Sequence, residues 1–216
     1  MGGELHYEFW SRLSFNYNLK SNWSIVSEFQ LRQQRNYLTE SGTSFTYPFA
    51  RSTRIWINKK LKNGLTVHLS PIAYFKNYDF NKSDSISITD RDEIRVSAAV
   101  SKSVRYRKLE FKTRLMLENR QLMYPNLWIE RGRIQEWINF QLKSYKRSSL
   151  NPYIMGEYFY RYSNRTFEFD QFRVQGGMIY KLKSADLILG LQWAHQSIEH
   201  KISDRIQSQV QVYINL

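Results

Sequence analysis

The chain has 216 residues, enough for one large domain, and its complete lack of cysteine excludes a disulfide scaffold, a cysteine-ligated zinc site and a thiol nucleophile. A formal net charge of +13 indicates an anionic neighbour such as nucleic acid, lipid phosphate or an acidic glycan. No unbroken apolar run of about 18 residues occurs, which excludes a transmembrane helix but leaves open a membrane barrel, whose strands alternate between apolar and polar residues.

Alternation of apolar and polar residues with a period of two, the signature of a β-strand, continues along almost the whole chain. It begins with Tyr7 and Phe9 against Glu8 and Arg12, and it ends with Val210 and Val212 against glutamines. The pattern predicts eleven strands, at residues 4–20, 23–35, 51–61, 65–78, 88–101, 106–120, 131–143, 152–163, 167–182, 185–198 and 202–216. No linker or composition break divides them, so we expect one domain spanning 1–216.

The connections between these strands alternate in length, as in an up-and-down meander. Residues 20–22, 62–64 and 183–184 are tight turns with Asn, Gly and Ser, whereas the links at 36–50, 79–87 and 121–130 are longer. Pro71 falls inside a predicted strand, where the sequence offers no reason for it. Gly176-Gly177 lies in the middle of another, where we expect a bend or bulge.

Three observations favour a membrane barrel with its apolar face outward over a soluble barrel or sandwich with an aromatic core. The strands exceed the usual 5–6 residues, and a lumen enclosed by ten to twelve strands is too wide to fill with apolar side chains. Aromatic residues gather at the strand ends, as two membrane interfaces require. Those near the tight turns are Tyr17, Trp23, Tyr106, Tyr145, Tyr153, Tyr180 and Tyr213. Those near the long loops are Tyr47, Phe49, Tyr78, Phe80, Tyr124, Trp128, Tyr162, Phe167 and Trp193.

The predicted fold class is therefore all-β, a single antiparallel up-and-down transmembrane β-barrel. Bacterial barrels have an even number of strands, so we expect about twelve, with ten as the fallback. The expected location is the outer membrane of a Gram-negative bacterium. Because no signal peptide follows Met1, we expect the sequence to be a mature form.

Several short segments of aromatic and basic residues resemble one family of outer-membrane barrels. They are Phe9-Trp10, Lys20-Ser21-Asn22-Trp23, Lys59-Lys60-Leu61-Lys62-Asn63-Gly64, Asp92-Glu93-Ile94-Arg95, Arg105-Tyr106-Arg107 and Asp170-Gln171-Phe172-Arg173. Together they are similar to a Bacteroidota outer-membrane β-barrel family, domain of unknown function 2490. The resemblance implies a fold and a location, and it implies no catalytic residues.

The inward face of the predicted strands carries charges of both signs. The residues predicted to line the lumen are Arg12, Arg32, Arg54, Arg95, Arg114, Arg120, Arg133, Arg173, Glu28, Glu93, Glu110 and Glu118. They are interpreted either as Glu–Arg ladders that hold the barrel closed or as the lining of a small anion-favouring pore. The first interpretation fits a structural or accessory component of a larger outer-membrane assembly. Expected partners are outer-membrane lipids, including the phosphates of lipopolysaccharide, and other outer-membrane proteins.

A second hypothesis concerns the end of the strand at 185–198. His195 and Ser197 share the lipid-facing parity, and Glu199 follows them, an arrangement similar to that of outer-membrane phospholipase A and the lipid A 3-O-deacylase. The alternative function is thus a lipid hydrolase that acts on phospholipid or lipid A. The remaining histidines do not cluster, so no metal site and no cofactor are predicted. Nucleic acid is not an expected partner, because the basic residues recur on one parity of almost every strand instead of forming one exposed patch.

Overall fold

The computed structural model describes residues 4–34, 45, 47–80, 88–124, 126–142, 148–163, 166–198 and 201–216. They form eleven strands and one 3-10 turn. The strands are β1 (Glu4–Asn18), β2 (Trp23–Gln34), β3 (Tyr47–Lys60), β4 (Leu65–Phe80), β5 (Ile88–Tyr106), β6 (Leu109–Leu122), β7 (Leu127–Phe140), β8 (Ser149–Ser163), β9 (Thr166–Lys181), β10 (Ala185–Ile198) and β11 (Lys201–Asn215). The 3-10 turn η1 (Lys62–Gly64) joins β3 to β4. None of the described residues forms a helix long and apolar enough to cross a membrane.

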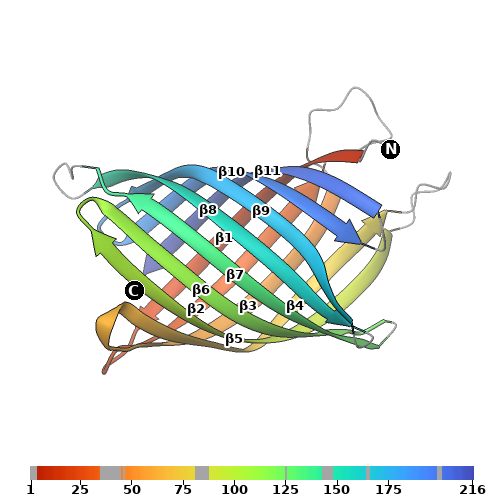
Figure 1. The fold of residues 1–216 in the computed structure, drawn as a ribbon, viewed down its shortest axis with the longest axis horizontal. Helices are drawn as coiled ribbons and strands as arrows, with labels where there is room; N and C mark the ends of the chain where they lie inside the picture. Colours follow the sequence, from red (N-terminus) through yellow and green to blue (C-terminus); the bar gives the residue numbers. More distant parts are fainter. Residues whose placement is uncertain are drawn as a thin grey trace.

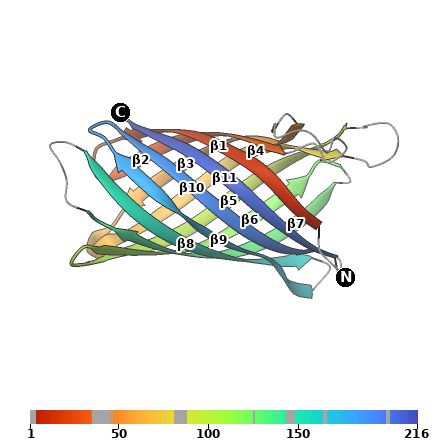
Figure 2. The same ribbon diagram turned by 90° about the horizontal axis from the view of Figure 1, so that it is seen from above.

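The strands close into a single barrel in which each pairs with its neighbours along the chain (Figure 1). The predicted all-β up-and-down barrel is confirmed, with eleven strands in place of the expected twelve. Because eleven is odd, β1 and β11 run in the same direction and close the barrel as a parallel pair, with Trp10 beside Gln209. The described chain therefore starts and finishes at opposite ends of the barrel (Figures 1 and 2). All other neighbouring strands pair antiparallel, as predicted.

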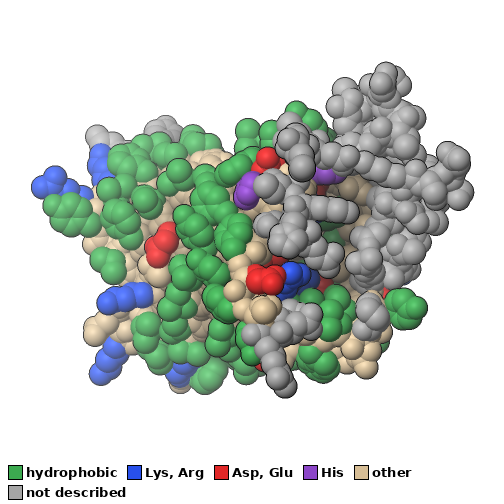
Figure 3. Space-filling model, turned by 45° about the vertical axis from the view of Figure 1, so that its right-hand side comes forward, with side chains coloured by type: hydrophobic (Ala, Val, Ile, Leu, Met, Phe, Trp, Pro, Cys, Tyr) green, Lys and Arg blue, Asp and Glu red, His purple; other side chains and the backbone are tan. Residues whose placement is uncertain are grey.

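The two faces of the sheet differ as the alternation predicts. On β6, Leu115 and Leu117 are 49% and 72% exposed on the outer wall, whereas Met116 and Glu118 are buried inside the barrel. Strands β1 to β10 each expose large apolar side chains on the outer wall, and hydrophobic side chains cover much of the face in Figure 3. The apolar face points outward, and the lumen holds the polar one.

The expected aromatic rings are present at both ends, with exceptions. Tyr17, Trp23, Tyr106 and Tyr180 are exposed at the tight-turn end, and the opposite end exposes Tyr124, Trp128, Tyr162, Phe167 and Trp193. Tyr153 is instead buried, and Tyr213 and Phe49 line the cavity, so these three assignments to the outer rings were wrong. Tyr153 and Tyr213 lie on the inward parity of their strands, which outweighs their position near a strand end, and Phe49 lies at the register shift between β2 and β3. Tyr78, like Tyr124, also lines the cavity, but it has the outward parity of the exposed Tyr74. The side chains of Tyr47 and Phe80, and all of Tyr145, lie outside the described part.

The two irregular positions of the sequence behave differently from each other. The register of β4 shifts between Ser70 and Ala73 against β5, and β3 shifts opposite, so Pro71 occupies a bulge where its missing N–H is tolerated. Gly176 and Gly177 lie in regular register with both neighbouring strands, so the expected bend there was wrong. A side chain at Gly177 would place its Cβ 2.0 Å from the Leu189 carbonyl oxygen, and this close approach accounts for the glycine.

The tight turns at 20–22 and 62–64 owe their shape to residues with positive φ. Ser21 and Asn22 between β1 and β2 have φ values of 59° and 66°, and Asn63 and Gly64 between β3 and β4 have 57° and 73°. Asn and Gly tolerate this left-handed conformation best, in agreement with the turn chemistry predicted for 20–22 and 62–64.

Candidate functional site: the charged lumen

The barrel encloses a cavity of about 1260 Å³ that is lined by side chains from all eleven strands. Thirteen of the lining residues are Arg or Lys and seven are Asp or Glu, so the lumen carries a positive excess. The structure places all twelve predicted lining residues in this cavity: Arg12, Arg32, Arg54, Arg95, Arg114, Arg120, Arg133, Arg173, Glu28, Glu93, Glu110 and Glu118.

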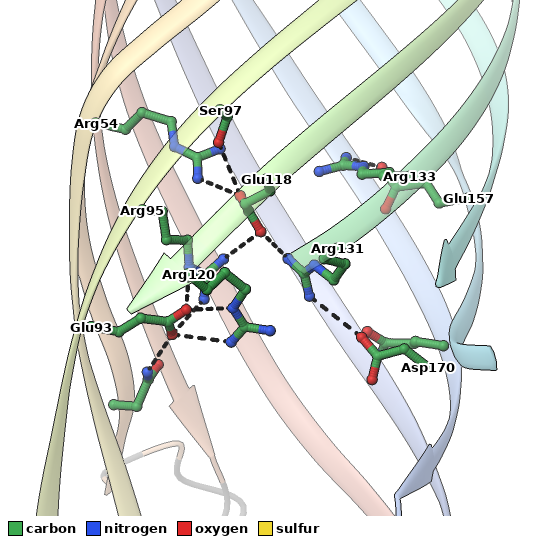
Figure 4. Close-up of polar contacts among 12 residues, drawn as sticks. Arg54, Glu93, Arg95, Ser97, Glu118, Arg120, Arg131, Arg133, Glu157 and Asp170 are labelled. Carbon is green, nitrogen blue, oxygen red and sulfur yellow. Dashed lines mark hydrogen bonds and ion pairs between the residues drawn. The ribbon is translucent and has the colours of Figure 1, made fainter. Parts of the chain in front are cut away.

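Glu118 on β6 is the centre of the largest ion-pair cluster (Figure 4). Its carboxylate accepts hydrogen bonds from Nη2 of Arg54 at 2.8 Å, Nη2 of Arg131 at 2.6 Å and Nη1 of Arg95 at 3.4 Å. Ser97 Oγ donates a fourth at 3.3 Å. One buried carboxylate thus joins arginines from three other strands.

Glu93 on β5 forms a second junction towards the long-loop end. Arg95 donates to it through Nε at 2.8 Å and through Nη2 at 2.9 Å, and Arg120 donates through Nη2 at 3.0 Å. Arg131 links these clusters to β9, because its Nη1 lies 3.6 Å from Oδ2 of Asp170. The ladders expected from cross-strand pairing therefore exist, but they branch across several strands (Figure 4).

Other acidic residues form ion pairs with arginines on the remaining walls of the lumen. Glu157 on β8 pairs with Arg133 and, at 3.6 Å, with Arg173. Glu8 lies 3.5 Å from Arg205, and Glu28 lies 3.9 Å from Arg12. Across the described lumen, eight arginines thus share six carboxylates.

Arg32 and Arg114 have no ion pair with any described residue, and both stack on indole rings. Arg32 lies 4.7 Å from the ring centre of Trp10, and Arg114 lies 4.6 Å from that of Trp56. A ring face stabilises a guanidinium by a cation–π interaction without neutralising its charge. These two residues therefore keep a full positive charge directed into the cavity.

The same two indole rings and Phe159 also contact further arginines. Arg12 shares Trp10 with Arg32, and Arg54 shares Trp56 with Arg114. Phe159 lies 4.5–5.1 Å from three guanidinium groups, those of Arg131, Arg133 and Arg173. Aromatic rings on the inner wall thus separate and orient neighbouring arginines that would otherwise repel one another.

Sequence reasoning missed one wall of the lumen and several of its charged residues. Buried glutamines on β10 and β11 form a neutral polar ladder in which Gln211 donates to Gln209 at 2.8 Å and Gln209 donates to Gln192 at 3.1 Å. Arg131, Glu157 and Arg205 were missed as well, although each has the inward parity of its strand. Parity is the signal that could have found them.

The second predicted site lies on the outer wall of β10. Nδ1 of His195 is 2.9 Å from Oδ1 of Asp204 on β11, an acidic partner that the sequence reasoning did not identify. Ser197 lies two positions further along β10 and pairs with Ile202. The side chain of Ser197 and all of Glu199 lie outside the described part. Among the described residues, no group of three His, Cys, Asp or Glu could hold a metal ion.

Comparisons with known proteins find a family and several similar folds. The model of a family described as "Protein of unknown function (DUF2490)" matches residues 7–207. Outer-membrane expressed OmpT of Vibrio cholerae has a TM-score of 0.43 and 10% identity, over 83% of this chain and 57% of OmpT. The β domain of the Bordetella autotransporter BrkA has a TM-score of 0.48 and 10% identity, over 88% of this chain and 82% of that domain. The chain thus spans less than three-fifths of OmpT, and no curated protein matches it in sequence.

Proposed function

The chain belongs to the DUF2490 family of proteins of unknown function, and from the barrel itself we propose that it is a non-enzymatic outer-membrane protein that forms a small, anion-favouring pore. The proposal has two parts, the location and the transport of anions. Each depends on a different face of the sheet.

The outer wall supports a place in the outer membrane of a Gram-negative bacterium. Soluble proteins rarely expose contiguous apolar patches larger than a few hundred Å². Here Leu, Ile, Val and aromatic side chains are exposed on strands β1 to β10, and exposed aromatic residues occur at both ends of the barrel. An apolar outer wall of this kind suits a barrel that is surrounded by outer-membrane lipids.

The observation that carries the pore proposal is the excess of positive charge in the lumen. Thirteen cationic lining residues face seven anionic ones, and Arg32 and Arg114 have no anionic partner among the described residues. Charge rings of one sign select ions of the opposite sign in narrow pores. Anions would enter this lumen more easily than cations.

The alternative is a structural or accessory role in a larger outer-membrane assembly, in which the branched ion pairs only hold the barrel closed. The two roles predict different results in planar lipid bilayers. We expect single-channel currents whose reversal potential in a KCl gradient shows a preference for chloride. Arg32→Gln, Arg114→Gln and Arg133→Gln should each lower that preference, whereas Arg105→Gln, at an exposed strand end, should leave it unchanged. Silent bilayers from a correctly folded barrel would support the accessory role.

A lipid hydrolase is the second candidate function, and the contact between His195 and Asp204 is the observation in its favour. In serine hydrolases a carboxylate orients the histidine through Nδ1, and Nε2 then acts on the serine. Purified barrel should hydrolyse phospholipid or lipid A under this hypothesis, and His195→Ala and Ser197→Ala should abolish the turnover. Turnover that is absent in the unaltered barrel, or unchanged in folded variants, would exclude it.

A further inference from the structure

Arg114 and Arg133 are neighbours on the inner wall at mid-height of the barrel. In the register of β6 and β7, Arg114 pairs with Gln135 and Arg133 pairs with Met116, so the two arginines are diagonal neighbours that project from the same face. Diagonal neighbours in an antiparallel pair have Cα atoms about 7–8 Å apart. Two long guanidinium side chains at this spacing can reach opposite sides of one small anion.

Both side chains are held in place by aromatic rings. The guanidinium of Arg114 lies 4.6 Å from the ring centre of Trp56, and that of Arg133 lies 5.1 Å from the ring centre of Phe159. Binding therefore requires less ordering of these flexible side chains than in free arginine. Nε of each arginine is buried and has no hydrogen-bond partner among the described residues.

The charges around the pair leave a local excess of about two. Arg133 shares the carboxylate of Glu157 with Arg173. Arg12 lies 3.9 Å from the carboxylate of Glu28. Arg54, which also lies near Arg114, is already bonded to Glu118. Among the described residues, Arg12, Arg114, Arg133 and Arg173 thus face only Glu28 and Glu157.

We propose that the lumen binds a phosphate-type oxyanion, free phosphate or the phosphate group of a larger solute, between the guanidinium groups of Arg114 and Arg133. Guanidinium groups have planar pairs of donors that match the oxygens of phosphate, whereas a halide uses only the charge. The local excess of two positive charges matches a doubly charged phosphate. This inference deepens the proposed function, on which it rests, by naming the class of solute for which the pore is adapted.

The test is isothermal titration calorimetry of the complete barrel in detergent, at constant ionic strength, with inorganic phosphate, glucose 6-phosphate and chloride as separate titrants. We expect phosphate to bind and chloride to give no saturable heat. Arg114→Gln should weaken phosphate binding about tenfold or more, because it removes a charged donor. Arg114→Lys should also weaken it, since lysine keeps the charge but loses the planar pair of donors. Binding of glucose 6-phosphate as well would point to solutes that carry a phosphate group, and its absence to free phosphate.

Lys112→Gln is the matched control, because Lys112 lies two residues from Arg114 on the same face of β6 and lines the same cavity. Equal weakening of phosphate binding by Lys112→Gln and Arg114→Gln, in barrels that still show a heat-dependent shift on SDS gels, would overturn the site. It would indicate that phosphate responds to the summed positive charge of the lumen and not to a defined pair of arginines. Equal affinity for phosphate and chloride would overturn it too. Silent bilayers with phosphate binding intact would contradict the proposed pore and support the phosphate site. A chloride-selective channel that does not bind phosphate would support the pore and overturn the phosphate site.

Discussion

At the scale of single residues, the lumen depends most on Glu118, because this buried carboxylate compensates three arginines at once. Arg54, Arg95 and Arg131 all donate to it, and it is 3% exposed. Arg54 has no second carboxylate partner among the described ion pairs, whereas Arg95 and Arg131 also contact Glu93 and Asp170. Loss of this one charge would leave Arg54 uncompensated and two other arginines only partly compensated.

We therefore predict that Glu118→Gln lowers the free energy of unfolding by about 3–5 kcal/mol, the cost of removing one partner from a buried ion pair. The measurement is guanidinium-induced unfolding of the barrel in detergent, followed by circular dichroism. Glu168→Gln is the control, because Glu168 is 53% exposed and its pair with Arg161 at 3.2 Å is worth about 0–1 kcal/mol. Similar losses in the two variants would show that burial of the cluster contributes little to stability.

At the scale of strands, alternation alone was sufficient to assign most faces, but it could not set strand limits or partners. β5 continues to Tyr106, past the predicted limit at 101, because Lys102 and Ser103 pair with β6 although they interrupt the apolar pattern. Near the other end of the barrel, the register shifts between Phe159 and Tyr160, and both Asp170 and Gln171 are buried opposite the shift. A bulge of this kind changes the parity of a strand, so Asp170 could not be assigned to the lumen from period two.

The same limit applies to the charged site. Parity placed Arg54 and Glu118 on inner faces, but their contact joins positions 64 residues apart on strands that are not neighbours. Such a contact depends on the curvature of the whole barrel and on side-chain length. Away from the bulges, the composition of the lumen was therefore predictable from the sequence, and its pairing was not.

The pairing of β8, β9 and β10 also explains why one glycine of the adjacent pair is required. A Cβ at Gly177 would lie 2.0 Å from the Leu189 carbonyl oxygen and 2.7 Å from Cα of Gly190, whereas a Cβ at Gly176 would meet only the Tyr153 carbonyl oxygen at 3.7 Å. We predict that Gly177→Ala destabilises the barrel by about 1–3 kcal/mol through overpacking. Gly176→Ala should change the stability by less than about 1 kcal/mol. The midpoint temperature of the band shift on SDS gels is the measurement, and equal effects of the two substitutions would contradict the argument.

At the scale of the whole molecule, the strand number and the charge of the lumen are connected. Eight strands leave an interior that side chains just fill, and sixteen to eighteen leave an open aqueous channel. Eleven strands lie between these limits, so long arginines from different walls meet and share carboxylates without closing the cavity of about 1260 Å³. The outer wall makes such a charged interior compatible with a membrane, because strands β1 to β10 each expose large apolar side chains to the outside.

The closing seam is the feature of the whole molecule that the sequence did not predict, and its parallel register is directly testable because the chain has no cysteine of its own. Ser11 of β1 lies beside Val210 of β11, at positions on the outer wall. Neighbouring strands are about 5 Å apart, which a disulfide can bridge. We predict that Ser11→Cys combined with Val210→Cys forms a disulfide on mild oxidation, giving a covalent ring that migrates faster on boiled, non-reducing SDS gels and reverts with dithiothreitol. Ser11→Cys combined with Ile206→Cys should not cross-link, because Ile206 lies four positions away on the same face, about 13 Å along the strand. Cross-linking of the second pair, or of neither, would mean that β1 and β11 do not close the barrel in this register.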